Sequence, residues 1–490
     1  MFSFDNTYAK LPARFYARLA PTPVRAPRLL CCNRALAAEL GVDVDWLRSD
    51  EGVAVLAGNR LAEGAEPLAQ AYAGHQFGNF VPQLGDGRAL LLGEVVDREG
   101  RRRDIQLKGS GPTPFSRRGD GRAALGPVLR EYLVSEAMAA LGIPTTRSLA
   151  AVATGEPVFR ETPLPGAVLT RVATSHIRVG TFEFFAARQD TESVSALVAH
   201  VIDRHYPAAA EADNPALALL AAVMERQAAL VARWLGVGFI HGVMNTDNTS
   251  VSGETIDYGP CAFMDWFDPA TVYSSIDHAG RYAYGAQSRI IGWNLTRLGE
   301  TLLGVIARDL DEAVTLATRT LEHFGAMMEQ AWLQVMRAKL GLTTARDEDG
   351  DLIKGLLTIM HNGRADYTNT FRALCDAAAD SAADAGARAE LSNADAYTAW
   401  AERWRARLTA EPGIDGPQRR DAMRRVNPAF IPRNHRVEAA LAAAARDDDL
   451  SLFDELHQVL SRPYDDQPEH AAYRNPPEPD QVVHATFCGT

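Results

Sequence analysis

Lysine, glutamate, asparagine and aspartate side chains occur in an order that could hold a metal-bound polyphosphate. Lys108 ends the segment DIQLK, and Glu131 follows in the segment REYLVSEAM. Farther along, the loop HGVMNTDN ends in Asn248, and the triplet DYG begins with Asp257. A lysine is a point charge for phosphate oxygens, and carboxylate and amide oxygens suit Mg²⁺. These residue types indicate a nucleotide site with a divalent metal.

Each residue also has an ordinary interpretation. A single Lys or Glu at such a place is most often a solvated surface charge, and Asp and Asn beside Gly commonly form turns. The chain order, however, is the order in which protein kinases hold ATP and magnesium: strand lysine, helix glutamate, His-led loop ending in Asn, and Asp-aromatic-Gly. We therefore expect Glu131 to form an ion pair with Lys108, and Asn248 and Asp257 to bind the metal.

The loop HGVMNTDN differs from the kinase loop in one respect. Kinases place the proton-accepting aspartate two residues after the loop histidine, and this chain has Val243 at that position after His241. Asp247, directly before Asn248, is the only carboxylate in the loop and is our candidate to accept a hydroxyl proton. Its ordinary role would be to cap the loop.

Arginines near Lys108 indicate how the phosphates are held. Arg88 lies in LGDGRAL, and Arg171 and Arg178 lie in TRVATSHIRVG. Arginine binds phosphate oxygens through two hydrogen bonds, so these residues predict an enclosed terminal phosphate. If the γ-phosphate is buried, the α-phosphorus faces the acceptor and pyrophosphate leaves. Further arginines around GDG could join this pocket or lie on the surface: Arg117, Arg118 and Arg122.

Longer motifs resemble the selenoprotein O family over nearly the whole chain. They are YAGHQFGNFVPQLGDGRA, QLKGSGPTPFSRRGDGRA, REYLVSEAM, HGVMNTDN, DYGPCAFMD and NPAFIPRNHRVE. The resemblance implies a pseudokinase that binds ATP in a flipped orientation and, with Mg²⁺ or Mn²⁺, transfers AMP to Ser, Thr or Tyr hydroxyls of proteins.

The same resemblance implies a role for individual residues. Asp247 would accept the proton, Asn248 and Asp257 would hold the metal, and Glu131 would pair with Lys108. The implied nucleotide contacts are Gly85, Gly87, Arg88, Lys108, Asp120, Gly121, Arg171, Arg178 and Asp257.

Cys488 lies in the tail FCGT, where members of this family carry selenocysteine or cysteine. By similarity its partner would be a cysteine near the metal-binding segment, and Cys261 is the local candidate. A reversible disulfide between them would pin the tail over the active site. Alternatively, Cys261 is a small buried apolar residue, which is the commoner role of a free cysteine.

Composition limits the class of protein. The 490 residues include 47% hydrophobic and 23% charged residues, enough for a large core and, at about 150 residues per domain, for two to four compact units. The net charge of −12 opposes binding to nucleic acid or anionic membranes. Five cysteines without CxxC spacing exclude a dense disulfide framework and favour a reducing compartment. Without a signal-peptide core or an uncharged apolar run of about 20 residues, we expect a cytoplasmic protein.

The elements that must position the candidate residues form an α+β chain. The runs RALLLGEVV and RRRDIQLKG predict a hairpin that turns at Gly100 and ends at Lys108. PVLREYLVSEAM predicts the helix that carries Glu131, and strands follow in SLAAVATGEPVFR and AVLTRVATSHIRVG. Helices dominate after about residue 190, interrupted by the polar segment with Asp247 and Asp257. The acidic stretch DEDGD is expected to be a loop.

We therefore predict a two-lobed, protein-kinase-like fold with N-terminal and C-terminal additions. The expected units are an N-terminal extension (1–75), a kinase-like N-lobe (76–185), a C-lobe with the catalytic loop and DYG segment (186–300), a helical region (301–461) and an extended, Pro-rich tail (462–490).

Two alternatives to AMP transfer remain open. One is a protein kinase that transfers the γ-phosphate with Asp247 as a displaced base, and the other is a non-catalytic ATP-binding scaffold. Val243 argues against standard phosphotransfer, whereas Asn248 and Asp257 argue against a dead site.

Overall fold

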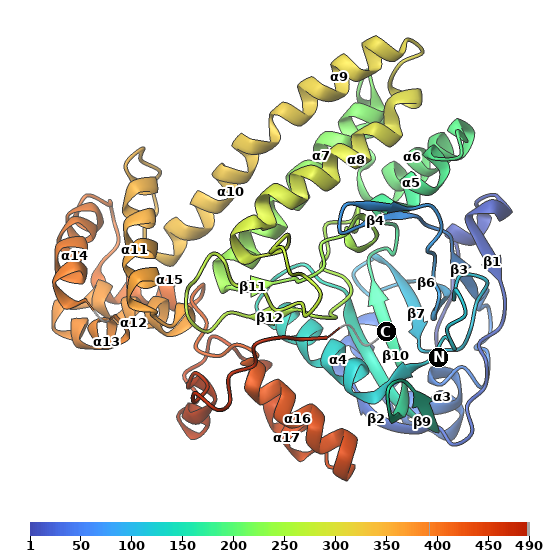
Figure 1. The fold of residues 1–490 in the computed structure, drawn as a ribbon, viewed down its shortest axis with the longest axis horizontal. Coiled ribbons are helices and arrows are strands. Elements are labelled where there is room, and N and C mark those ends of the chain that lie inside the picture. The colour runs from blue at the N-terminus through green and yellow to red at the C-terminus, as the bar shows by residue number, and fades with distance from the viewer. Residues whose placement is uncertain (392, 488–490) are drawn as a thin grey trace.

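The computed structural model describes residues 1–391 and 393–487, and its strands and long helices lie in separate regions. Figure 1 shows most of the strands gathered in the part of the molecule built from the first 173 residues, with the long helices extending away from it. This mixture confirms the predicted α+β class.

One antiparallel sheet organises the first part. Its strand order is β1-β3-β6-β7-β10-β9-β2, and β8 pairs with β10. The strands are β1 (Tyr16–Arg18), β2 (Arg28–Cys32), β3 (Leu68–Gln70), β6 (Ala89–Val96), β7 (Arg102–Lys108), β8 (Ala123–Ala124), β9 (Arg147–Phe159) and β10 (Pro163–Ala173). Two small antiparallel pairs lie outside it: β4 (Gly74–Gln76) with β5 (Asn79–Val81), and β11 (Phe239–Ile240) with β12 (Ala262–Phe263). Because β1, β2 and β3 come from residues 1–75, this segment shares a sheet with the residues that follow it.

Helices make up most of the remaining structure. They are α1 (Arg34–Leu40), α2 (Val44–Arg48), α3 (Asp50–Leu56), α4 (Leu125–Ala140), α5 (Val179–Ala186), α6 (Thr191–His205), α7 (Pro215–Val237), α8 (Gln287–Ile306), α9 (Leu310–Glu322), α10 (Phe324–Lys339), α11 (Asp349–Gly363), α12 (Tyr367–Ala379), α13 (Asp384–Glu390), α14 (Ala394–Thr409), α15 (Gly416–Arg424), α16 (Asn434–Asp447) and α17 (Ser451–Leu460). Short 3₁₀ turns include Thr246–Asn248 and Pro468–Arg474.

The sheet is packed on both faces, as the alternation of its side chains requires. Val152 and Val168 belong to a buried cluster with α1, α2 and α3. Their chain neighbours Ala151 and Leu169 belong to a second cluster with α4. Successive residues of a strand point to opposite faces, so α4 lies on the face away from the N-terminal helices.

Helix α4 is clamped from its other side by the C-terminal part of the chain. Phe453 and Leu456 of α17 share a buried cluster with α4, and Figure 1 shows α16 and α17 beside it. Arg130 on α4 donates to the carbonyl of Cys261 at 2.6 Å and to Oδ1 of Asn434 at 3.1 Å. The helix that carries Glu131 is thus fixed by contacts from more than one region of the chain.

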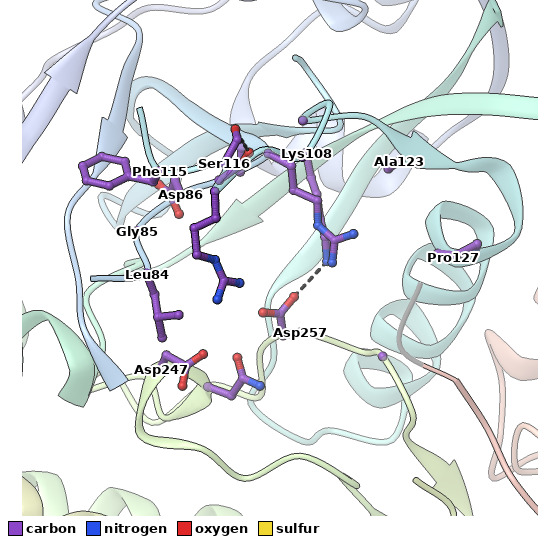
Figure 2. A pocket seen from close by; sticks show the side chains of 18 of the residues that line it. Leu84, Gly85, Asp86, Lys108, Phe115, Ser116, Ala123, Pro127, Asp247 and Asp257 are labelled. Carbon is purple, nitrogen blue, oxygen red and sulfur yellow. Dashed lines mark hydrogen bonds and ion pairs between the residues drawn. The ribbon is translucent and has the colours of Figure 1, made fainter. Parts of the chain in front are cut away.

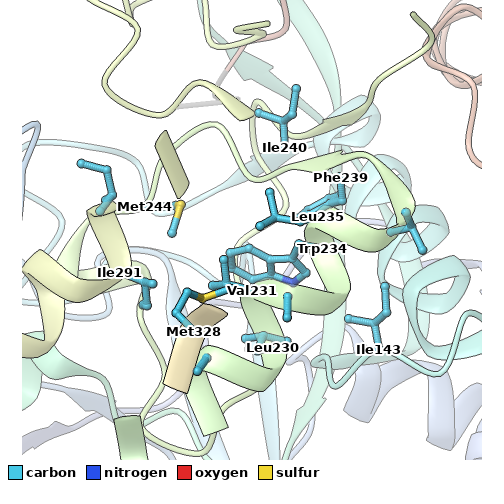
Figure 3. Close-up of a cluster of buried hydrophobic side chains, with 14 of the residues drawn as sticks. Ile143, Leu230, Val231, Trp234, Leu235, Phe239, Ile240, Met244, Ile291 and Met328 are labelled. Atoms are coloured by element: carbon cyan, nitrogen blue, oxygen red, sulfur yellow. The ribbon is translucent and has the colours of Figure 1, made fainter. Parts of the chain in front are cut away.

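The long helices surround a third core, built around Trp234 of α7 (Figure 3). The Trp234 indole is 3% exposed and donates to Oγ1 of Thr255 at 2.9 Å. Among the described residues, α7 is the one helix long and apolar enough by composition to cross a membrane. Much of the apolar surface of α7 is instead buried inside the protein, since Leu230, Val231 and Leu235 lie in this core.

Two local predictions were wrong in part. The stretch DEDGD is not wholly a loop, because α11 begins at Asp349, whose buried carboxylate accepts from Arg337 at 2.7 Å and from Arg407 at 2.8 Å. The tail is not extended throughout, because Pro468–Arg474 forms 3₁₀ turns. Proline suits the first turn of a helix, and Arg433 donates to the carbonyl of Arg474 at 2.9 Å.

A buried lysine generates a prediction about stability. Lys339 is 2% exposed, donates to Oδ1 of Asn427 at 2.8 Å and lies 4.2 Å from the centre of the Phe371 ring. Burial lowers the pKa of Lys339 from 10.5 to about 7. Between these two values the unfolded chain binds a proton that the folded chain releases, so this lysine costs stability as the pH falls from 10.5 to 7.

We compare the free energy of unfolding of Lys339→Met with that of the wild type at each pH. The difference, variant minus wild type, should be more favourable to the variant at pH 7 than at pH 10 by on the order of 2–4 kcal/mol. Chemical denaturation of both proteins at the two pH values measures the difference. Lys354→Met, which removes an exposed lysine, is the control. A stability difference that is the same at both pH values would contradict the expectation.

Candidate functional site

A pocket of about 760 Å³ lies between the sheet, α4 and the loops that follow β11. Figure 2 shows Lys108 on its strand, with Asp247 and Asp257 on loops across from it. Every residue predicted to contact the nucleotide, bind the metal or accept the proton lines this pocket: Gly85, Gly87, Arg88, Lys108, Asp120, Gly121, Arg171, Arg178, Asp247, Asn248 and Asp257. Glu131 lines it too.

Two cations and two carboxylates form a cluster in the pocket, in which Arg171 and Glu131 are buried and Lys108 and Asp257 are partly exposed. Lys108 Nζ lies 2.6 Å from Oε2 of Glu131 and 2.8 Å from Oδ1 of Asp257. Arg171 donates through Nε to Oε1 of Glu131 at 2.7 Å and through Nη2 to Oδ1 of Asp257 at 3.1 Å. Burial disfavours the charged form of both carboxyls, yet Lys108 and Arg171 lower the pKa of Glu131 and hold that of Asp257 well below its usual range. Both carboxylates are therefore ionised.

Backbone structure aims this cluster into the pocket. Lys108 is the last residue of β7 and lies opposite Ala89 of β6 and Leu169 of β10, so its strand is held on both sides. Asp257 has a φ of 68°, which is uncommon for a residue with a side chain and occurs often at functional sites. The preceding carbonyl, that of Ile256, is 2.9 Å from Nε2 of His241. This contact gives His241 a structural role, because it ties the loop to the residue before Asp257.

Asp247 is buried in a different environment. It is 7% exposed, and its Oδ2 accepts a hydrogen bond from Gln76 at 3.1 Å. Its Oδ1 has no hydrogen-bond partner in the described part of the chain. Burial raises the pKa of Asp247 to about 6, although the Gln76 hydrogen bond and the charge of Arg178 oppose the rise. A carboxylate that lines the pocket and has this pKa suits a general base.

Asn248 and Asp257 are the residues that could hold a divalent metal. Asn248 donates through Nδ2 to the carbonyl of Val243 at 3.0 Å, which leaves its amide oxygen as the end suited to a cation. No group of three or more His, Cys, Asp or Glu side chains that could hold a metal occurs in the described residues. Mg²⁺ commonly binds through one or two protein oxygens together with phosphate oxygens and water, so this donor pair fits a metal that arrives with a nucleotide.

The glycines of the two GDG motifs allow their backbone to pack closely against neighbouring residues. Gly85 has a φ of 72°, and a Cβ there would lie 2.3 Å from the Phe115 ring. Gly121 has a φ of 65°, and a Cβ there would lie 2.1 Å from Gly111. Asp120 accepts from the backbone of Arg122 at 2.9 Å and pairs with Arg160 at 2.9 Å. These residues shape the rim of the pocket.

The remaining predicted arginines differ in environment. Arg178 is 3% exposed, lies 4.4 Å from the centre of the Tyr72 ring and donates to the carbonyl of Asp247 at 3.0 Å. Arg122 donates to the carbonyls of Thr22 and Pro23, which gives it a structural role. Arg117 and Arg118 line the pocket, and both have positive φ values, 49° and 81°.

The pocket residues missed by the reasoning from sequence include Tyr72, Gln76 and Asp86. Asp86 is buried, lies 3.9 Å from Arg178 and accepts from the backbone of Gln70 at 3.0 Å. A signal was present for Asp86, because GDGRA occurs twice in the chain, at residues 85–89 and 119–123. No comparable signal marks Gln76, whose partner Asp247 is far away in the sequence.

The predicted cysteine pair is only half described. Cys261 is fully buried, and burial raises its pKa to about 11. Cys488 lies outside the described residues, so the disulfide stays a prediction. The tail does reach this region, since Oγ1 of Thr486 donates to the carbonyl of Pro260 at 2.7 Å. Trp400 and Trp404 are buried packing residues, stacked with ring centres 5.2 Å apart.

Comparisons with known proteins agree on one group of enzymes. Residues 1–461 match the family described as protein adenylyltransferase SelO. A protein nucleotidyltransferase YdiU from Rhizobium etli (strain CIAT 652) is 64% identical over 491 residues, which cover 100% of this chain and 97% of that protein. The YdiU proteins of Bradyrhizobium diazoefficiens and Rhizobium meliloti (strain 1021) are each 63% identical over 489 residues, which cover 100% of this chain and 99% of those proteins.

The buried cluster generates a prediction about stability. We expect Glu131→Gln to destabilise the fold by about 3 kcal/mol, because Lys108 and Arg171 would then share a single carboxylate in a buried site. Chemical denaturation measures the loss. The control is Glu438→Gln, whose side chain is 46% exposed and pairs with Arg130 at 2.7 Å, and which should cost under about 1 kcal/mol. Equal losses in the two variants would show that the cluster is not a special source of stability.

Proposed function

Because the chain belongs to the SelO family of protein adenylyltransferases, and is therefore a protein nucleotidyltransferase that transfers AMP to proteins, we propose how its pocket performs that reaction. The two-lobed kinase-like fold is part of this proposal, with an N-lobe at residues 76–185 and a C-lobe at residues 186–300. The arrangement of the pocket supports two lobes, because the sheet and α4 lie on one side of it and the loops with Asp247 and Asp257 lie on the other.

We propose that ATP binds with its terminal phosphate toward Lys108 and Arg171. Arg171 is 2% exposed, so a phosphate beside it is enclosed and cannot be the group passed to an acceptor. Arg178 and Arg88, which also line the pocket, would bind the remaining phosphate oxygens. This orientation leaves the α-phosphorus toward Asp247. The observation that carries the proposal is the presence in one pocket of the cluster of Lys108 and Arg171 and of a separate carboxylate, that of Asp247.

Asn248 and Asp257 are proposed to hold the metal ion, either Mg²⁺ or Mn²⁺. When bound, the ion would neutralise phosphate charge and polarise the α-phosphate. Lys108 and Arg171 keep Asp257 ionised and hold it in place, so the carboxylate is ready before the nucleotide arrives. Glu131 in turn positions both cations.

The proposed transfer begins when a Ser, Thr or Tyr hydroxyl of the acceptor protein reaches Asp247. The carboxylate of Asp247 takes the hydroxyl proton while the hydroxyl oxygen attacks the α-phosphorus. The bond from that phosphorus to the bridging oxygen breaks, and pyrophosphate leaves with the oxygen. Gln76 donates to Oδ2 of Asp247, which helps to orient the carboxylate. We further propose a cytoplasmic location and no nucleic-acid or membrane partner, supported by the net charge of −12.

Labelled ATP separates this proposal from a kinase or a binding scaffold. Incubated with acceptor protein and metal, the chain should incorporate label from the α-phosphate of ATP and none from the γ-phosphate, because pyrophosphate carries the γ-phosphate away. Autoradiography of the two parallel reactions measures the outcome. Label from the γ-phosphate alone would indicate a kinase, and the absence of both labels would indicate a scaffold.

Substitutions of the two pocket aspartates should have different effects. Asp247→Asn should keep metal-dependent ATP affinity but lower the rate of AMP transfer by about 100-fold or more, since it removes the base. Asp257→Ala should lose metal-dependent ATP binding itself. Isothermal titration with ATP, with and without Mn²⁺, and α-label incorporation measure both effects.

The control for these variants is Asp268→Asn, whose side chain is 48% exposed and outside the pocket lining. It should behave as wild type in both assays. Wild-type transfer by Asp247→Asn would refute the base, and unchanged metal-dependent binding by Asp257→Ala would refute the metal ligand.

A further inference from the structure

The β4–β5 hairpin lies beside the catalytic loop and has a strained turn. Its two turn residues, Phe77 and Gly78, have φ values of 51° and 84°, a conformation that suits glycine but not phenylalanine. Phe77 is held there because its N–H donates to Oδ1 of Asn245 at 3.0 Å and its ring lies 5.0 Å from that of Tyr282. Strain of this kind often accompanies function.

The hairpin is tied to the loop that carries Asp247. Gln76 donates to Asp247, and the N–H of His75 donates to Oγ1 of Thr246 at 2.7 Å. The Thr246 hydroxyl donates to Glu183 of α5, whose other oxygen lies 2.5 Å from Nδ1 of His75. Figure 1 shows β4 close to α5 and α8. Since Gln76 also lines the pocket, the hairpin forms part of the rim next to Asp247.

The outer side of the hairpin is uncharged and partly apolar. Residues 76–83, QFGNFVPQ, contain no charged side chain, and Phe80 is 40% exposed. Phe80 packs against His75 with ring centres 4.9 Å apart, and His75 lies 5.2 Å from the Trp293 ring of α8. The exposed face is therefore continuous from the hairpin to α8.

Arginines surround this uncharged face, and we name Arg188, Arg281 and Arg297 the basic rim. Arg188 donates to the carbonyl of Pro82 at 3.1 Å. The guanidinium groups of Arg281 and Arg297 lie 4.8 and 5.0 Å from the centre of the Trp293 ring. A guanidinium held on an aromatic ring is orientated and partly desolvated, which favours binding of a carboxylate.

Most of the positive charge in the basic rim is not neutralised by the chain itself. Arg297 pairs with Glu300 at 2.6 Å. Within residues 1–391 and 393–487, Arg188 and Arg281 form no ion pair with a carboxylate. The nearby carboxylate of Asp277 is buried and accepts from the backbone N–H groups of Arg281 and Tyr282. None of the three arginines lines the nucleotide pocket, so they are not placed to bind the nucleotide phosphates.

We propose that the hairpin and the basic rim dock an acidic segment of the acceptor protein. The proposal rests on the function proposed above and names its substrate class: proteins in which Asp or Glu side chains lie within a few residues of the modified hydroxyl. The carboxylates would pair with Arg281 and Arg188 while the hydroxyl enters beside Gln76 and reaches Asp247. On a chain of net charge −12, a local positive rim selects where an acidic partner can approach.

Direct binding of synthetic peptides tests the docking surface without any chemistry. The probes are three dye-labelled peptides with one central serine, flanked by Glu, Gln or Lys. Fluorescence anisotropy at low salt should show that the wild type binds the Glu peptide about fivefold or more tightly than the Gln peptide, and that added salt weakens this preference. Arg281→Glu should lose the preference and bind the Lys peptide best.

The matched control is Arg289→Glu, which changes the net charge equally at an exposed position on α8 outside the basic rim. It should keep the wild-type preference. Arg281→Gln and Arg188→Gln serve as milder variants if charge reversal lowers the melting temperature. Equal binding of the Glu and Lys peptides by the wild type, or equal loss in Arg281→Glu and Arg289→Glu, would overturn the proposal.

Transfer of α-label to the same peptides separates this proposal from the function on which it rests. At saturating ATP, Arg281→Gln should raise KM for the Glu peptide about threefold to fivefold and change kcat less than twofold. A charge preference in binding without any α-label incorporation would count against the proposed chemistry and support the docking surface. Incorporation into all three peptides with equal kcat/KM would support the chemistry and overturn the docking surface.

Discussion

The ion-pair cluster of Lys108, Glu131, Arg171 and Asp257 is the interaction on which the site depends. Its members come from β7, α4, β10 and a loop of the helical half, so their contacts join the sheet to the rest of the molecule. Buried charges are costly unless each is paired and hydrogen-bonded, and here each cation contacts both carboxylates. Packing on both faces of the sheet and the clamp on α4 hold these elements at the required separation.

Two aspartates ten residues apart in the chain acquire opposite properties from their surroundings. Asp257 has its pKa held low by Lys108 and Arg171, whereas burial raises the pKa of Asp247, which has Gln76 as a neutral partner and Arg178 near its backbone. Environments that separate the pKa values of similar groups also separate their roles. One carboxylate stays charged and is suited to a cation, and the other is suited to exchanging a proton.

The sequence predicted well what depends on local pattern. The strand ending at Lys108, the helix carrying Glu131 and the meeting of the charged motifs in one pocket follow from periodicity, turn residues and motif order. Contacts between distant segments were not predictable in this way. Gln76 acquires its role only because the β4–β5 hairpin packs against the loop that carries Asp247. Asp349 is buried at the start of a helix, and not in a solvated loop, because Arg337 and Arg407 donate hydrogen bonds to its carboxylate. The kinase-like lobes, the site roles and the disulfide of Cys488 stay predictions.

The clamp on α4 also bears on when the protein becomes able to act during its synthesis. Helix α4 contacts Asn434 through Arg130 and packs against α17, which ends at Leu460. Strand β2 likewise pairs with β9, which is synthesised more than 100 residues later. A nascent chain emerging from the ribosome therefore lacks part of the support for its own pocket until α17 has been translated. The architecture thus couples completion of the pocket to many long-range contacts, which slow folding.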